Sequence, residues 1–332
     1  MDFTELIDLA SEKLGGAVLI ANDDFFAPKE NLLKASAPVW REGEYTDRGK
    51  WMDGWESRRR RTPGFDWCIV RLGLPGVIRG VTVDTSYFRG NYPEHCSLEG
   101  ATFAGLPTVE ELIDDSVQWV PLLPQMPLAG DSQNNFPVQY DERITHLRFK
   151  IYPDGGVARL RVYGIVSPDW ERLKRSGGDI DLAAAENGAL VISCSDMFFG
   201  HRHNLIMPGR AANMSDGWET KRRRGPGHDW AIIQLARRGE IHSVEVDTSH
   251  FKGNFPDSCS LEIYNAPDGG EHDLSDLSTP WTSLLLRTKL QAHTRHYFEQ
   301  ELSDSGAASH LRFNIFPDGG VSRLRVYGKP VD

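Results

Sequence analysis

The chain has 332 residues and a formal net charge of −10, with the apolar and charged fractions of an ordinary globular protein. This length accommodates two domains of about 150 residues, each large enough to bury its own core. The acidic balance argues against a nucleic-acid-binding protein, because phosphate binding needs a basic face, but it allows a small anion held by local arginines. No run approaches the roughly 18 apolar residues of a membrane span, so we expect no membrane partner.

The N-terminal segment predicts a short amphipathic helix over residues 4–14, because its apolar residues recur at helical spacing. The first residues carry acids where a signal peptide carries bases, which predicts a cytoplasmic protein. A strand is expected over residues 17–21 and its match over residues 189–193. Each of these strands leads into an acidic, aromatic loop, in which Asp23 and Asp196 correspond.

Short runs with strand character dominate the rest of the first half, separated by Gly-Pro, Asp-Gly-Gly and Gly-Asn turns. In several of these runs apolar and polar residues alternate, as they do in strands with one buried face. The expected strands are residues 67–72, 80–84, 97–99, 146–151 and 159–163. Long helical patterns are scarce, so the predicted fold class is all-β, with an antiparallel β-sandwich or jelly roll in each half.

Long blocks of the first half return in the second half. The matching blocks are residues 53–67 and 216–230, 83–93 and 246–256, and 151–164 and 315–328. A copied unit of this size is a whole domain, far longer than a solenoid repeat. We therefore predict a first repeat over residues 1–166, a linker over residues 167–187 and a second repeat over residues 188–332.

The four cysteines form no Cys-x-x-Cys pair and no dense framework, so we expect reduced, buried thiols. They are Cys68, Cys96, Cys194 and Cys259.

Each repeat carries four consecutive basic residues, at positions 58–61 and 221–224. Alternate side chains of an extended run face opposite sides, so such a run can be a salt-bridged edge or can turn an arginine into a pocket. The second interpretation suits a carboxylate ligand, because the guanidinium group donates two parallel hydrogen bonds. For this role the second repeat offers Arg222, Arg223 and Arg224.

Acids recur at equivalent positions of the two repeats, and each is either a structural partner of an arginine or a catalytic group. They are Asp53, Glu56, Asp66 and Asp84, with their counterparts Asp216, Glu219, Asp229 and Asp247. Asp84 and Asp247 end predicted strands, where capping a turn is expected. Asn91 and Asn254 lie in a Gly-Asn-aromatic-Pro loop that suits a turn or a ligand-contacting rim equally well.

Histidines distinguish the two repeats. His228 replaces Phe65, and His250 replaces Tyr87. With neighbouring acids, these histidines are acid–base candidates, so a single catalytic repeat should be the second. A His-x-His pair at residues 201–203 is a weak metal signal, since no third ligand has a diagnostic spacing.

The repeated motifs together are similar to those of the allantoicase (allantoate amidinohydrolase) family. They are Asp-Gly-Trp-Glu followed by the basic run, Pro-Gly-His-Asp-Trp, Val-Asp-Thr-Ser-His-Phe-Lys-Gly-Asn-Phe-Pro and Arg-Leu-Arg-Val-Tyr-Gly. The resemblance implies two tandem jelly-roll domains of the galactose-binding-like type and an enzyme that hydrolyses allantoate to ureidoglycolate and urea. It also implies a homo-oligomer.

We assign the expected roles to residues of the second repeat. The predicted catalytic residues are His228, His250, Glu219 and Asp229, and the predicted substrate-binding residues are Arg222, Arg223, Arg224, Asn254, Lys252 and Asp216. No cofactor is certain, and a divalent metal such as Mn²⁺ stays open. The alternatives are a hydrolase for a related ureido acid such as ureidoglycolate and a non-enzymatic tandem carbohydrate-binding module.

Overall fold

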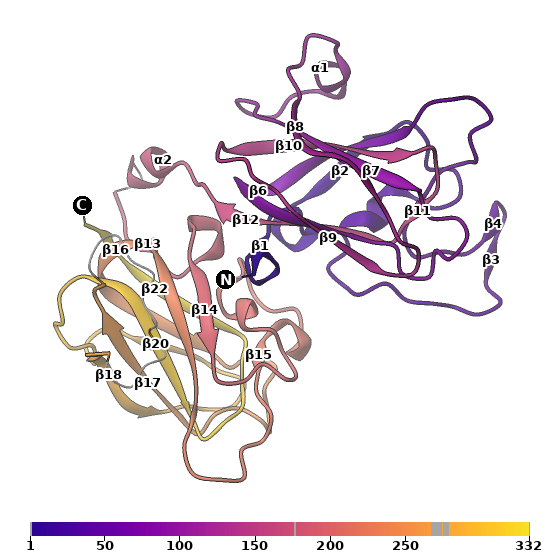
Figure 1. The fold of residues 1–332 in the computed structure, drawn as a ribbon. Helices are drawn as coiled ribbons and strands as arrows, with labels where there is room; N and C mark the ends of the chain where they lie inside the picture. The colour runs from indigo at the N-terminus through magenta and orange to yellow at the C-terminus, as the bar shows by residue number, and fades with distance from the viewer. Residues whose placement is uncertain (1, 176, 267–273, 275–278, 332) are drawn as a thin grey trace. The chain divides into compact units, whose positions relative to one another are not determined.

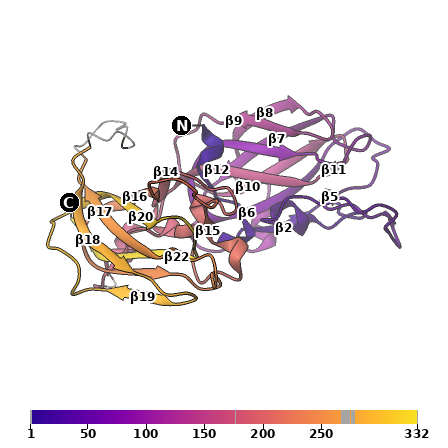
Figure 2. The ribbon, with the colours of Figure 1, turned by 90° about the horizontal axis from the view of Figure 1, so that it is seen from below.

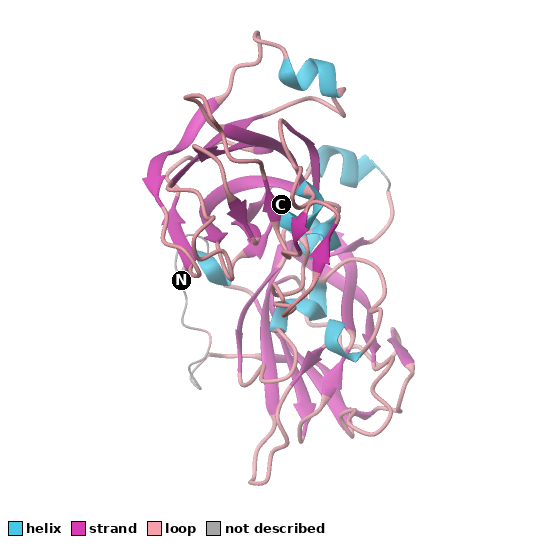
Figure 3. Ribbon diagram, turned by 90° about the vertical axis from the view of Figure 1, so that its right-hand side faces the viewer, coloured by secondary structure: helices cyan, strands magenta, loops and turns pink. Residues whose placement is uncertain are grey.

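The computed structural model describes residues 2–175, 177–266, 274 and 279–331, and its chain divides into two compact units, Met1–Ser167 and Pro168–Asp332. Strands dominate both units, and the helical pieces are short (Figures 1 and 3). All pairings between the strands are antiparallel. The predicted all-β fold with two tandem sandwich domains is therefore confirmed.

The first unit contains one eight-stranded sheet and two small pairs of strands. The order in the sheet is β1-β12-β6-β10-β7-β8, with β2 and β9 also paired to β6. Its strands are β1 (Ile7–Asp8), β2 (Ala17–Ala21), β6 (Asp66–Asp84), β7 (His95–Ala101), β8 (Val120–Pro127), β9 (Gln133–Pro137), β10 (Ile144–Tyr152) and β12 (Arg159–Val166). The small pairs join β5 (Trp55–Glu56) to β11 (Gly156–Val157), and β3 (Tyr45–Thr46) to β4 (Gly49–Lys50).

One long strand, β6, holds this sheet together, although the sequence indicated two separate strands over its length. Its first part, ending at Arg71, pairs with β2 and β10. Its last part, from Gly76 to Asp84, pairs with β12, and with β9 from Gly80 onward. The register with β10 shifts between Arg71 and Gly76, and the two parts of this one strand pair with different neighbours (Figure 2).

The second unit repeats this arrangement, in the order β13-β22-β16-β20-β17-β18, with β14 and β19 also paired to β16. Its strands are β13 (Ile180–Asp181), β14 (Leu190–Cys194), β16 (Asp229–Asp247), β17 (Ser258–Tyr264), β18 (Thr282–Lys289), β19 (Arg295–Phe298), β20 (Ala308–Phe316) and β22 (Arg323–Pro330). A small sheet joins β15 (Trp218–Glu219) to β21 (Gly320–Val321).

The predicted N-terminal helix is wrong. Its residues form two 3₁₀ turns, Phe3–Glu5 and Glu12–Leu14, on either side of β1, which pairs with β12. The buried Leu9 follows this strand, and its N–H donates to Val162 O at 2.7 Å. An isolated helix of this length is marginal in water, so pairing with the sheet prevails over local helical spacing.

Residues 167–187 contain more structure than the sequence indicated. A short helix, α2 (Trp170–Arg175), is followed by β13, which pairs with β22 as β1 pairs with β12. The other helix of the chain's described part, α1 (Val109–Ile113), begins with a complete Thr108 capping box.

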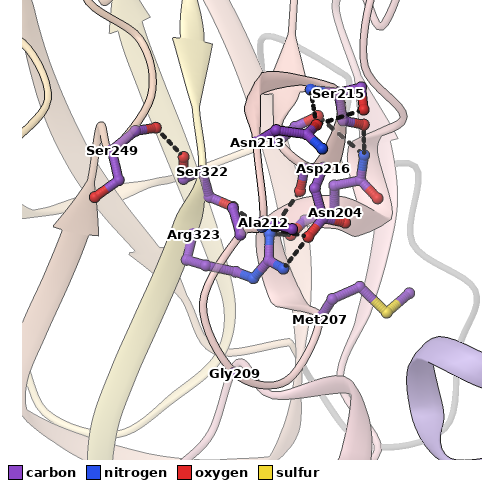
Figure 4. A network of polar contacts seen from close by, with 12 residues as sticks. Asn204, Met207, Gly209, Ala212, Asn213, Ser215, Asp216, Ser249, Ser322 and Arg323 are labelled. Carbon is purple, nitrogen blue, oxygen red and sulfur yellow. Dashed lines mark hydrogen bonds and ion pairs between the residues drawn. The ribbon is translucent and has the colours of Figure 1, made fainter.

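Each unit buries an arginine–aspartate pair at the start of its last long strand. Arg159 bonds Asp53 Oδ2 at 2.7 Å and Asp53 O at 2.9 Å. Arg323 makes the equivalent bonds to Asp216, at 3.0 and 2.6 Å, and a further bond to Asn204 O (Figure 4). Because these arginines are almost fully buried, their charges depend on these partners.

The four cysteines are free, as expected, and three of them are fully buried. Burial raises the pKa of Cys96 and of Cys259 to about 12, so these thiols stay protonated and unreactive at neutral pH. Among the described residues, no helix has the length and apolar character needed to cross a membrane.

Asp53→Ala and Asp216→Ala should each destabilise their own unit by about 3–5 kcal/mol, because each leaves a buried guanidinium group without its carboxylate. Thermal and urea unfolding of the full chain measure this loss. Asp141→Ala is the matched control, since it breaks an exposed pair with Arg79 and should cost at most about 1 kcal/mol. Equal losses in the three variants would contradict the assignment.

His146 should contribute a loss of stability as the pH drops from about 6.5 toward 4. Burial lowers the pKa of this side chain from 6.5 to about 4, and its buried Nε2 makes no hydrogen bond. Between these values the unfolded chain binds a proton that the folded chain does not, so acid favours unfolding. His146→Gln should reduce the difference between urea midpoints at pH 7 and pH 5, and an unchanged difference would disprove this role.

Candidate active site

A glutamate–asparagine pair occupies the same position in each unit. The side-chain amide of Asn91 donates to Oε1 of Glu56 at 2.7 Å. Asn254 donates to Oε1 of Glu219 in the same way. The sequence left a turn and a ligand rim open for both asparagines, and the structure places each amide on a cavity wall, bound to a glutamate.

The backbone holds Glu56 on both sides. It lies opposite Gly156 in the β5–β11 pair, and it forms a bridge with Ala27 on its other edge. The preceding residue, Trp55, is fully buried, and its indole Nε1 donates to Asp23 O at 2.8 Å. The Trp-Glu motif thus anchors an aromatic ring in the core and presents the next carboxylate at the surface of the sheet.

The Asp-Gly-Gly turn brings the loop that carries Asn91 close to this strand. The N–H of Gly156 donates to Asn91 O at 2.7 Å. A Cβ atom at Gly156 would lie 1.9 Å from the ring of Phe88, so only glycine fits there. Asp154 accepts a bond from the Arg60 N–H at 2.8 Å, which ties the turn to the basic run.

Glu56 and Asn91 line a cavity of about 780 Å³, which we call the first cavity. Phe26, Trp40 and Met52 contribute apolar surface, and the charged and amide groups of the wall belong to Glu42, Lys50, Glu56, Arg89 and Asn91. This combination of apolar walls with a few convergent polar groups is typical of small-molecule sites.

Two cationic side chains line the first cavity, and they have different partners. Arg89 is held by Asp131, with Nε to Oδ2 at 2.9 Å, and Asp131 also accepts a bond from the Tyr87 N–H at 2.8 Å. Lys50 lies over the ring of Trp40, 4.1 Å from its centroid, and makes no ion pair within the described ranges. Lys50 is therefore available to pair with a ligand anion.

Glu56 is the carboxyl group of the first cavity that is adapted to proton transfer. Burial raises the pKa of Glu56 above the usual value of 4.5, and the hydrogen bond from Asn91 opposes this shift only in part. Oε1 is bound to Asn91, while Oε2 makes no hydrogen bond in the described part of the chain. Oε2 is thus the atom that can carry and transfer a proton.

Another cavity, of about 540 Å³, lies beside the Glu219–Asn254 pair, and we call it the second cavity. Phe199 and Gly253 line it, as their counterparts Phe26 and Gly90 line the first. The rest of its wall is different, because it comes from the basic run and from the Asp-Gly-Gly turn, including Arg222, Arg223 and Asp318.

An insertion explains this difference. Thirty positions separate Asp23 from Asp53, whereas twenty separate their counterparts Asp196 and Asp216. The additional residues include the β3–β4 hairpin, and this segment supplies Trp40 and Lys50 to the first cavity. The equivalent stretch of the second unit, residues 197–215, contains no such hairpin.

The residue that holds Arg89 in the first unit, Asp131, is also replaced in the second unit. Tyr87 and Asp131 adopt φ values of 70° and 50°, and His250 and His293 match them at 71° and 51°. The His250 N–H donates to His293 Nδ1 at 2.7 Å, where Tyr87 donates to a carboxylate. The counterpart of Arg89, Lys252, therefore has no equivalent of Asp131 to hold it.

Four of the ten predicted site residues lie together on the second cavity, namely Glu219, Arg222, Arg223 and Asn254. Neither predicted catalytic histidine lines it. His228 bonds Asn314 Oδ1 at 3.2 Å and lies on the ring of Phe316, and burial lowers its pKa. Nε2 of His250 lies 2.9 Å from Ala211 O.

The other four predicted residues also lie off this cavity. Asp216 is held by Arg323, and the buried Asp229 pairs with Arg223. Arg224 and Lys252 are exposed. The buried acids of these motifs therefore hold arginines, which is the structural role that the sequence left open for them.

The basic runs follow the alternation expected of extended chains. Arg58 pairs with Asp23 at 2.6 Å, and Arg60 pairs with the buried Asp66 at 2.7 Å. The intervening Arg59 and the following Arg61 are exposed. Asp84 accepts a bond from the Ser86 N–H at 2.8 Å, as expected of an acid that caps a turn, and so does Asp247 from Ser249 at 2.7 Å.

The His-x-His segment does not lie on a strand. His201 precedes the 3₁₀ turn Arg202–Ile206, and its Nδ1 accepts a bond from the His203 N–H at 3.3 Å. Throughout the described ranges, no three or more histidine, cysteine, aspartate or glutamate side chains are grouped so as to hold a metal ion.

Sequence reasoning missed the first cavity because it weighed the residues shared by the repeats and the histidines specific to the second. Two features of the sequence point to this cavity. One is the unequal spacing around the insertion, and the other is Asp131, which stands at the position that His293 occupies in the second repeat. Trp40, Lys50 and Arg89 could have been proposed from these two observations.

Comparison with known proteins agrees with this duplicated architecture. A family model, the allantoicase repeat, matches residues 7–167 and 180–331. The chain belongs to the allantoicase family. It is 50% identical to a probable allantoicase of Pseudomonas paraeruginosa, covering 99% of this chain and 97% of that protein. It is also 50% identical to an allantoicase of Dictyostelium discoideum, covering 97% and 87%.

A solved structure shares the fold of this member of the allantoicase family. The crystal structure of allantoicase from Saccharomyces cerevisiae has a TM-score of 0.83 and 36% identity, covering 97% of this chain and 93% of that chain.

Proposed function

We propose that this protein is an allantoicase that hydrolyses allantoate to ureidoglycolate and urea, and that the reaction takes place in the first cavity. The family match and the relatives named allantoicase over nearly the whole chain support the activity. One observation supports the location: a glutamate of raised pKa, bound to an amide, faces a cavity that also holds two cations.

The substrate requires four kinds of group. Allantoate is a small carboxylate whose central carbon carries two ureido groups. Hydrolysis breaks the bond from this carbon to one ureido nitrogen, which takes a proton and leaves as urea, and water supplies the hydroxyl that replaces it. The site therefore needs a cation, partners for the ureido groups, an acid for the departing nitrogen and a base for water.

Glu56 can serve as both acid and base in turn. Its raised pKa favours the protonated form, which donates from Oε2 to the departing ureido nitrogen. The resulting carboxylate then accepts a proton from the water that adds to the central carbon. The carboxyl group returns to its first state, and no covalent intermediate with the protein is needed.

The other groups of the first cavity bind the substrate. Arg89, oriented by Asp131, suits the carboxylate through paired hydrogen bonds, and Lys50 adds a second positive charge. Asn91 offers the amide group that complements a ureido group, while Trp40 and Phe26 exclude water.

The second cavity is the alternative location, and it corresponds to the predicted site of the second repeat. In its favour, Arg222 and Arg223 line it beside Glu219 and Asn254. His228 and His250, the predicted acid–base residues of this repeat, do not line this cavity, so in this alternative Glu219 is the acid–base group on its wall.

Cytoplasmic location and self-association, both expected from the sequence, remain proposals. Light scattering of the purified chain tests self-association. Product analysis separates the proposed reaction from its two alternatives, which are carbohydrate binding and the hydrolysis of a related ureido acid. Only allantoicase releases urea and ureidoglycolate from allantoate.

Glu56→Gln should lower the rate of urea release from allantoate by at least about 100-fold, because the amide neither donates nor accepts the required proton. The matched variant Glu219→Gln should keep most of the activity. Urea and ureidoglycolate are measured together, with and without prior EDTA treatment, which also shows whether a divalent ion such as Mn²⁺ is needed. The opposite ranking of the two variants would place the reaction in the second cavity.

Asp131→Asn should raise the KM for allantoate about three- to tenfold and leave kcat within about twofold. Arg89 would lose the carboxylate that orients it, and the substrate carboxylate is bound equally in the ground and transition states. Steady-state kinetics measures both constants. A large fall in kcat with unchanged KM would show that this pair acts on the chemical step instead.

A further inference from the structure

The second cavity retains a ligand-binding wall although it lacks the parts that complete the first. The Glu219–Asn254 hydrogen bond, Phe199 and Gly253 repeat the ureido-binding side of the first cavity. A glutamate–asparagine pair presents both an acceptor and a donor, the pattern that a urea-like group needs.

A cation for a carboxylate is also present in the second cavity, but it comes from a different segment of the chain. In the first cavity the free cation is Lys50, which comes from the inserted segment. In the second, Arg222 lines the wall formed by the basic run, is exposed, and makes no ion pair within the residues that the structure describes. Its neighbour Arg223 is already paired with Asp229.

We propose that the second cavity binds a small carboxylate carrying a ureido group and does not turn it over. This inference rests on the proposed function, which places the reaction in the first cavity. The ureido group contacts the Glu219–Asn254 pair, and the carboxylate contacts Arg222.

Catalysis is absent from the second cavity because its architecture lacks two features of the first. The wall that carries Trp40 and Lys50 has no counterpart among residues 197–215, so this stretch gives the second cavity neither the aromatic ring nor the cation of that wall. His293 stands where Asp131 orients Arg89, and the exposed Lys252 does not line the cavity. Binding of a product-like molecule needs neither feature.

The test uses N-carbamoylglycine, which carries one carboxylate and one ureido group and lacks the second ureido group of the substrate. Isothermal titration of the full wild-type chain should give two equivalents per chain. Arg222→Ala should weaken one of them at least tenfold and leave the other unchanged. Arg224→Ala is the matched control, because this exposed arginine belongs to the same run but does not line the cavity, and it should preserve both equivalents.

Asn91→Leu and Asn254→Leu assign the equivalents to the cavities, since each should remove one and spare the other. A single equivalent in the wild-type chain, in whichever cavity, would overturn the inference. So would two equivalents that Arg222→Ala leaves unchanged. Loss of turnover in Glu56→Gln together with a single equivalent would leave the proposed function standing and refute the second binding site alone.

Discussion

The buried pairs Arg159–Asp53 and Arg323–Asp216 organise the site region of each unit. Each arginine also bonds backbone carbonyls of the segment that precedes the Trp-Glu strand, such as Ser36 O at 2.9 Å from Arg159. A buried guanidinium group has five donors to satisfy, so several chain segments must meet at one point. This fixes the start of β5 and, through Trp55, the position of the glutamate that follows.

The duplicated sequence predicted the fold well, because strand alternation and turn residues act locally and are repeated twice. It also identified Glu219, Arg222, Arg223 and Asn254 as residues that meet. It did not separate acids that hold arginines from acids that face solvent, since Asp229 and Glu219 look alike in a motif. Their difference is burial, which depends on contacts with distant strands.

The N-terminal segment shows why one expectation failed, and the histidines show what a difference between the repeats leaves undecided. The apolar residues over positions 4–14 have helical spacing, but the segment forms no helix there. Its short strand β1 pairs with β12 instead. His228 and His250 differ from Phe65 and Tyr87 in chemistry, but they occupy equivalent backbone positions, and their ring nitrogens contact Asn314 and a carbonyl group. A substitution between repeats therefore marks a difference without saying on which side the function lies.

The β3–β4 hairpin has a consequence for how duplicated domains diverge. Lengthening a surface loop costs little free energy, because the entropy of closing a loop grows slowly with its length. Here the longer loop enters one copy only, while the strands and the buried arginine of both copies stay the same. Two copies of one scaffold can thus acquire separate tasks through a change at the periphery, and exchanging residues 34–52 for residues 207–215 is the minimal graft between them.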